Sequence, residues 1–145
     1  MSKTFDETSP YVQTHLGIMQ NVIQRMASNS ASCKSWCITI ISAMLLIFID
    51  KDKWSFIWIT FFPSFLFFIL DTYYLALEKG LRNSYDLFVN KIHNEQLSTT
   101  DLFSVKPIGN QFVLIRESLK SFSIWGFYLP LVTLILMAKC FLINT

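Results

Sequence analysis

The chain has little of what a soluble enzyme needs. Only 15% of its 145 residues are charged, against about 25% in a typical soluble domain, while 52% are apolar and 16% are aromatic. A soluble protein of this size exposes a large surface, and this composition does not supply the polar side chains to cover it. The same figures exclude intrinsic disorder. A formal net charge of +2 is too small to indicate a dedicated nucleic-acid-binding protein.

Glycine, cysteine and histidine are also scarce, with 4, 3 and 2 residues. Four glycines leave no glycine-rich phosphate loop, and three cysteines on or near apolar runs make neither a disulfide framework nor a metal quartet. His15 and His93 lack a nucleophile or carboxylate at a recognised spacing, so we expect surface or packing roles for them. We therefore expect that the protein is not an enzyme and that it binds no cofactor or metal.

Three apolar runs predict an all-α integral membrane protein with three transmembrane helices. The third run, Phe122–Ile143, exceeds the roughly 20 residues that cross about 30 Å of hydrocarbon. The first two, Trp36–Ile49 and Trp54–Leu70, reach this length with their flanks, where Lys34 can extend its charge to the interface. A helical hairpin in a soluble core is the alternative, but the second run has no polar stripe to face water.

Lysine and arginine predict the orientation, because they are retained on the cytoplasmic side. Six of them lie between the second and third runs, which places the N-terminus and this long segment in the cytoplasm. The first thirty residues lack a signal-peptide pattern, so the first span is expected to act as an uncleaved insertion signal. We predict a cytoplasmic amphipathic helix over 1–31, transmembrane helices over 32–49, 54–71 and 122–143, an extracytoplasmic turn over 50–53, and a cytoplasmic helical stalk and loop over 72–121.

Two of the three spans are expected to continue as helices outside the membrane. Ser9 and Pro10 form a helix start, with a capping hydroxyl and a proline in the first turn. Gly17 is the only glycine before the turn, so this helix is expected to run into the first span as one rod, with residues 28–32 as its weak point. The second span is expected to continue to about Ile92. A helix then resumes near residue 112, and a kink is predicted in the third span at its proline.

A row of hydroxyl side chains enters the membrane along this rod at spacings of three and four residues. We name it the hydroxyl seam, and its members are Ser28, Ser32, Ser35, Thr39 and Ser42. Small residues allow close helix packing in lipid, and hydroxyls can bond back to their own helix. The other interpretation is a water-lined pore face, repeated around a symmetric homo-oligomer. The residues alone leave both open.

The charged residues near the membrane have two candidate roles each. Asp71, at the bilayer edge, is interpreted as a solvated or hydrogen-bonded interface residue rather than a proton relay. Basic residues with aromatic neighbours could bind a phosphate-rich ligand, or could reflect cytoplasmic retention and contact with anionic lipid. The candidate ligand-binding residues are Arg25, Arg82, Lys106, Arg116 and Lys120.

Two stretches, Gln20–Ala43 and Leu70–Asp86, resemble small membrane proteins of bacterial anti-phage defence loci, the SLATT-type and related few-span effectors, including the transmembrane subunits of Hailong-like systems. They cover a little over a quarter of the chain. The resemblance implies a homo-oligomeric pore of the bacterial inner membrane that depolarises the infected cell. It also implies control by a nucleotide or oligonucleotide from a partner nucleotidyltransferase, and in the Hailong-like version the ligand holds the channel shut.

Two other functions fit the same residues. One is a non-conducting anchor or assembly subunit that recruits a cytoplasmic enzyme to the membrane lipid. The other is a toxin-like protein that disrupts membranes without a ligand. Conductance of reconstituted oligomers separates the anchor from the pore, and toxicity without partner genes identifies the toxin.

Overall fold

The computed structural model describes residues 9–51 and 54–143. The all-helical prediction is confirmed, because the described residues form helices joined by short connections and contain no strand. In chain order the elements are α1 (Pro10–Asp50), the 3₁₀-helix η1 (Trp54–Thr60), α2 (Phe61–His93), the short 3₁₀-helix η2 (Thr99–Asp101), α3 (Gln111–Leu119) and α4 (Phe122–Ile143).

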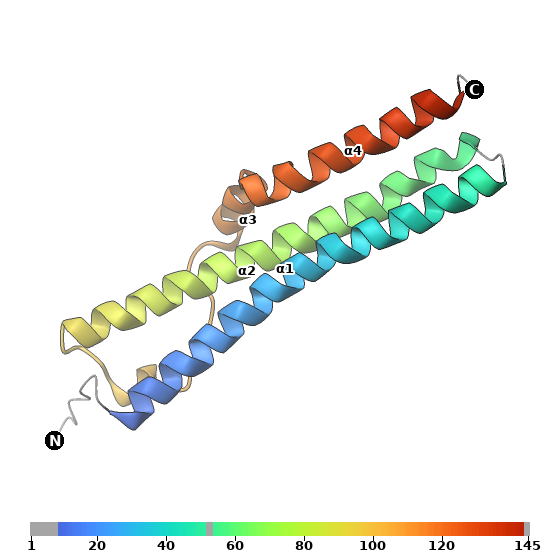
Figure 1. Cartoon of the computed structure of the whole chain (residues 1–145). Coiled ribbons are helices and arrows are strands. Elements are labelled where there is room, and N and C mark those ends of the chain that lie inside the picture. Colours follow the sequence, from blue (N-terminus) through green and yellow to red (C-terminus); the bar gives the residue numbers. More distant parts are fainter. Residues whose placement is uncertain (1–8, 52–53, 144–145) are drawn as a thin grey trace.

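The helices α1 and α2 form a long antiparallel hairpin, and α4 lies beside the part of it nearest the turn (Figure 1). The 41 residues of α1 extend for about 62 Å, roughly twice the hydrocarbon thickness of a bilayer. Three helices are long and apolar enough to cross a membrane: α1, η1 with α2, and α4. We call residues 34–50, 54–71 and 122–143 the apolar half, and residues 10–33 and 72–121 the polar half.

The helix α1 runs without a break, as predicted. Its only proline lies in the first turn, and the polar stretch over residues 28–32 does not interrupt it. Ser30 explains the continuity, because its side chain is buried against α2 and hydrogen-bonded there. The predicted capping hydroxyl is wrong, since the Ser9 side chain makes no cap hydrogen bond. Its backbone carbonyl instead accepts hydrogen bonds from the amides of Val12 and Gln13.

The second span begins as a 3₁₀-helix and becomes an α-helix only at Phe61. Pro63 lies in the first turn of α2, where a backbone N–H has no partner within the helix, so the proline is accommodated. The Thr60 hydroxyl donates to the carbonyl of Ile57 at 2.6 Å and satisfies an acceptor of η1. The helix α2 then continues to His93, which confirms the predicted extension beyond the apolar run.

The apolar half has one core to which every long helix contributes. The helix α4 continues through Pro130 without interruption, and the kink there stays a prediction. Tyr128 and its neighbours on α4 pack against α1 and the start of the second span. The buried members of this core are Cys37, Ile41, Ile57, Ile124, Tyr128 and Ile135.

In the polar half, a connecting segment lies across the hairpin. We call residues 94–110 the strap, because they return from the end of α2 toward its middle (Figure 1). The amide of Ile108 donates to the carbonyl of Gly80 at 2.9 Å, and the Asn83 side chain donates to the carbonyl of Ile108 at 3.2 Å. A second core forms beneath the strap from Val12, Met19, Phe88, Leu97 and Leu102.

Candidate functional site

A group of polar side chains from three helices is buried where the apolar and polar halves meet. We call it the buried charge node, and its members are Ser30 and Lys34 of α1, Asp71 of α2, and Tyr128 of α4. The Asp71 side chain is 0% exposed, and the Lys34 side chain is 18% exposed. Burying ionisable side chains is costly, so a buried ion pair marks a candidate functional site.

The three polar side chains of the α1–α2 contact form a closed triangle. Lys34 Nζ lies 2.6 Å from Asp71 Oδ2, and the Ser30 hydroxyl donates to Asp71 Oδ1 at 2.5 Å. Lys34 Nζ also donates to Ser30 Oγ at 3.2 Å. Ser30 and Lys34 are four residues apart and therefore lie on one face of α1. Each side chain holds the other two in position.

The helix α4 joins this node through Tyr128. Its side chain is buried near Asp71, and its hydroxyl makes no hydrogen bond to another described residue. The ring packs edge-on against Phe68 of α2, with centroids 5.3 Å apart. Cys33 and Cys37 lie buried on the same face of α1 as free thiols. The node therefore connects all three long helices at one level.

The environment of Asp71 corrects one part of the sequence interpretation. The carboxylate is hydrogen-bonded and ion-paired, and it is not solvated. The sequence does not identify its partner, because a lysine at the edge of an apolar run is expected to extend its charge to the interface. The sequence does carry one signal. Ser30 and Lys34 are four positions apart on the first long helix, and Asp71 is the one acidic residue near the end of the second apolar run.

The hydroxyl seam faces away from the other helices. All five of its residues are exposed, so neither α2 nor α4 covers them. Two of the hydroxyls bond back to their own helix: Ser35 donates to the Ala31 carbonyl at 3.3 Å and Thr39 to the Ser35 carbonyl at 2.9 Å. Back-bonding lowers the cost of placing a hydroxyl in lipid but leaves the groove between turns free for a neighbour.

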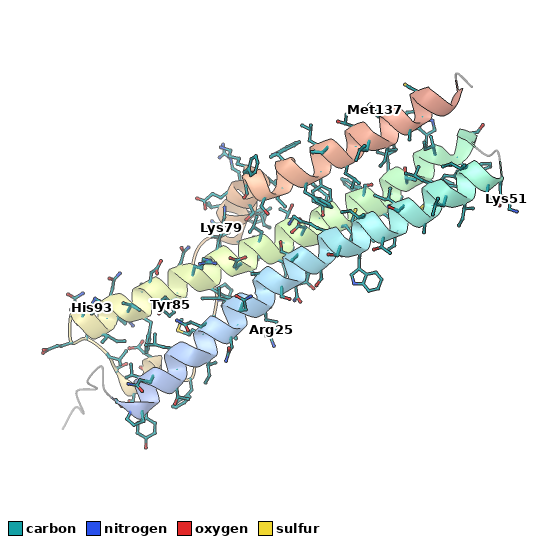
Figure 2. The ribbon with its side chains drawn as sticks, in the orientation of Figure 1. Arg25, Lys51, Lys79, Tyr85, His93 and Met137 are labelled. Atoms are coloured by element: carbon teal, nitrogen blue, oxygen red, sulfur yellow. The ribbon has the colours of Figure 1, made fainter. Side chains whose placement is uncertain are left out.

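The candidate basic residues occupy three separate places. Arg82 lies on α2, where its guanidinium pairs with Glu78 at 2.8 Å, and it lines an open groove of roughly 590 Å³ between α1 and α2. Gln20, Gln24 and Tyr85 line the same groove. Arg25 is exposed on α1 directly after Gln24; Arg25 and Tyr85 are labelled in the polar half in Figure 2.

The remaining three basic residues lie elsewhere. Lys106 belongs to the strap and lines a different groove, together with His15 and Lys91. Arg116 and Lys120 are exposed in the last turn of α3 and at its C-cap, where the chain turns into α4. The structure therefore separates residues that the sequence grouped by charge.

A buried histidine ties the strap to α1. His15 is 1% exposed, and its Nδ1 accepts a hydrogen bond from the amide of Phe103 at 3.1 Å. Burial lowers the pKa of His15, and the nearby Asp101 carboxylate partly opposes this shift. Phe103 has a φ of 61°, a left-handed conformation that a non-glycine residue adopts only when its surroundings hold it there. The sequence predicts a surface or packing role for His15, and the structure shows a buried histidine whose hydrogen bond to the strap has no local sequence signal.

Lys91 and Asp101 hold the other side of the strap. Lys91 Nζ donates to Asp101 Oδ1 at 2.6 Å, and Ser98 forms a capping box with the same aspartate. The hydrogen bond from Lys91 lowers the pKa of the Asp101 carboxyl, with a further contribution from Ser98. The strap is thus fixed to both helices of the hairpin.

In the described residues, no group of three histidine, cysteine, aspartate or glutamate side chains could hold a metal ion. Neither the sequence nor the fold matches a known protein family, a characterised protein or a solved structure.

Proposed function

We propose that this protein is the subunit of a homo-oligomeric pore in the bacterial inner membrane, with its N-terminus and strap in the cytoplasm. In this proposal the pore depolarises the cell as an effector of anti-phage defence, and a nucleotide or oligonucleotide from a partner nucleotidyltransferase controls it. The observation that carries the pore is the exposed hydroxyl seam on a helix long and apolar enough to span a membrane. The defence role and the nucleotide control rest on the resemblance of Gln20–Ala43 and Leu70–Asp86 to defence effectors.

A membrane environment gives this seam two possible neighbours, another protein surface or water. Polar residues in membrane spans face protein or water rather than lipid. No helix of the described chain covers the seam, so a second copy of the chain would supply the covering surface. Repetition of that contact around a closed ring places one α1 from each subunit next to a central axis.

The buried charge node supports a role for α1 in gating. A signal received in the polar half has to reach the apolar half, and α1 crosses both without a break. The Lys34–Asp71 pair fixes α1 against α2 at the boundary between the halves. A ligand shifts the pore only if it binds one arrangement of these helices more tightly than the other.

The groove in the polar half is a suitable receptor for such a ligand. Its volume of roughly 590 Å³ lies in the usual range of small-molecule sites. Arg82 supplies a cation for phosphate, Tyr85 a ring for stacking, and the amides of Gln20 and Gln24 can pair with the edge of a base. Asp86 lines the same groove and can accept from an amino group.

Conductance of the purified protein in planar bilayers tests the pore. We expect Thr39→Leu and Ser42→Leu to reduce single-channel conductance severalfold, because each places an apolar side chain on the proposed pore face. Thr133→Leu is the matched control, since Thr133 is an exposed threonine of α4 with the same back-bond, to Leu129 at 2.9 Å. Unchanged ion flux in both α1 variants would show that the seam does not line the pore, and an absence of conductance in the wild-type oligomer would favour the anchor function.

Binding of short labelled oligonucleotides tests the receptor groove. We expect Arg82→Gln to weaken binding about tenfold, because it removes a charged contact to phosphate. Lys51→Gln, an exposed lysine at the opposite end of the hairpin, should leave affinity unchanged. Equal affinity of wild type and Arg82→Gln would exclude this groove as the site.

A further inference from the structure

An apolar groove of roughly 570 Å³ lies between α2 and α4 in the apolar half. Phe61, Phe65 and Phe68 form its α2 wall, and Leu129 and Val132 form much of its α4 wall. None of the charged residues that the structure describes lines it. If the apolar half crosses a membrane, as in the proposed function, the occupant of this groove comes from the bilayer or from another copy of the chain.

The groove is short and runs along the helices. On α4 it extends from Trp125 to Thr133, a rise of about 12 Å along the helix axis. An acyl chain lying parallel to the helices can pack part of its length in this open apolar groove. The groove ends near the junction of α3 and α4, at the level where lipid headgroups begin.

Two cations lie at the C-terminal end of α3, in the segment that leads into this end of the groove. The indole of Trp125 donates to the carbonyl of Leu119 at 2.6 Å, which fixes the corner between α3 and α4. Arg116 and Lys120 lie four residues apart at this corner, on one face of α3, and both are exposed. Among the described residues neither has an ion-pair partner.

We propose that this corner and groove bind one anionic phospholipid, with its phosphate at Arg116 and Lys120 and one acyl chain between α2 and α4. Charge complementarity selects a lipid over a second copy of the chain, because an apolar helix in the groove would leave both cations unpaired. The inference rests on the membrane location in the proposed function, but it requires neither conductance nor a nucleotide.

Fluorescence quenching by brominated lipid tests the site directly. Replacing the other three of the four tryptophans by phenylalanine leaves Trp125, which lines the groove, as the sole reporter. In phosphatidylcholine vesicles, brominated-chain phosphatidylglycerol should quench Trp125 at roughly tenfold lower mole fraction than brominated-chain phosphatidylcholine, as expected for two cations near an anionic headgroup. Equal quenching by the two lipids would overturn the proposal.

Two variants separate the headgroup contact from the chain contact. Arg116→Gln with Lys120→Gln should reduce the phosphatidylglycerol preference to the phosphatidylcholine level. Arg25→Gln with Lys51→Gln also removes one arginine and one lysine and should keep the preference. Val132→Phe fills the groove and should lower quenching by both lipids. Persistence of full quenching in Val132→Phe would show that the lipid acyl chain does not occupy the groove.

Further outcomes distinguish a lipid from free phosphate, and distinguish failure of the lipid site from failure of the proposed pore. If the two lipids quench equally while millimolar inorganic phosphate binds the wild type and not the Arg116→Gln, Lys120→Gln variant, the two cations bind free phosphate and the lipid assignment is wrong. An absence of conductance in the wild-type protein, together with a clear lipid preference, would overturn the proposed pore alone. Intact conductance with equal quenching would overturn the lipid site alone.

Discussion

The two halves of the α1–α2 hairpin are held together by different means. In the apolar half, the ion pair between Lys34 and the fully buried Asp71 fixes the helices beside one apolar core, and the Ser30 hydroxyl donates to the same carboxylate. In the polar half, the strap holds α1 and α2 together through several weaker contacts. These are apolar side chains, backbone hydrogen bonds, the His15 hydrogen bond and a partly exposed ion pair.

With the apolar half in a membrane, as in the proposed function, the solvent of each half explains this difference. Water drives apolar side chains together, so a core of ordinary hydrophobic residues is enough to position the strap on the polar half. Lipid is as apolar as the helices themselves and provides no such force between them. A specific polar contact in the apolar half therefore contributes more to the choice of one helix arrangement, and its loss should have the larger consequence.

The largest effect is expected from removing one member of the buried pair. Lys34→Met leaves the Asp71 carboxylate buried without a cation, and we expect the free energy of unfolding in detergent to fall by about 3–5 kcal/mol. Combining it with Asp71→Asn should recover most of the loss, because no charge then remains buried. Lys51→Met is the control, since its pair with Asp50 is exposed and should contribute at most about 1 kcal/mol. Equal effects of the two lysine variants would contradict the special role of the node.

A smaller loss is expected where the strap crosses α2. A Cβ atom at Gly80 would lie 2.8 Å from Pro107 Cβ and 3.1 Å from Leu114 Cδ1, so Gly80→Ala has to displace the strap. We expect a loss of about 1–3 kcal/mol in unfolding free energy and faster proteolysis of residues 94–110. Gly17→Ala meets nothing within 4 Å and should instead stabilise α1 by up to about 1 kcal/mol. The same sign for both substitutions would show that the strap does not pack closely on α2.

The smallest effect is expected from pH, acting through His15. The pKa of this histidine is lowered in the folded protein, so the unfolded chain binds the proton more readily. Its contribution is complete above pH about 6.5 and declines as the pH falls through the lowered folded value. Protonation also turns Nδ1 from an acceptor into a donor, which loses the bond from Phe103 and is worth about 1 kcal/mol.

Amide hydrogen exchange of the strap between pH 7.5 and pH 5 measures this effect, after correction for the intrinsic pH dependence of exchange. Protection should fall on acidification in wild type. His15→Asn keeps an acceptor but does not titrate, so its protection should be nearly independent of pH. His93→Asn removes the only other histidine and should retain the wild-type response. A wild-type response in His15→Asn would assign the pH dependence to another group.

Most of the helices could be predicted from the sequence, because helix signals are local. The missing prolines and the single Gly17 predicted the unbroken α1, and apolar spacing predicted both the extension of α2 and the presence of α3. The 3₁₀ start of the second span could not be predicted. It depends on the contacts at the transition from 3₁₀-helix to α-helix, where the Thr60 hydroxyl donates to the Ile57 carbonyl and Pro63 lies in the first turn of α2.

The candidate sites show the limits of reading residues by type. The hydroxyl seam is a local pattern on one helix, so the sequence predicts that its residues share a face. Its exposure depends on the tertiary structure, because α2 packs against another face of α1. The basic residues were grouped because they share a charge, but the structure places Arg82, Lys106 and Arg116 in different surroundings. Charge is a property of a residue, whereas a site is a property of the distances between residues.

The sequence by itself determined the helical class, the three apolar segments and the faces on which polar residues recur, because each of these depends on neighbours three or four positions away. Only the tertiary structure decided which charges meet. Lys34 and Asp71 are 37 positions apart, and His15 and Phe103 are 88 apart, so no local spacing connects them. The hairpin and the strap bring these groups within hydrogen-bond distance, and burial there gives each contact its energetic weight.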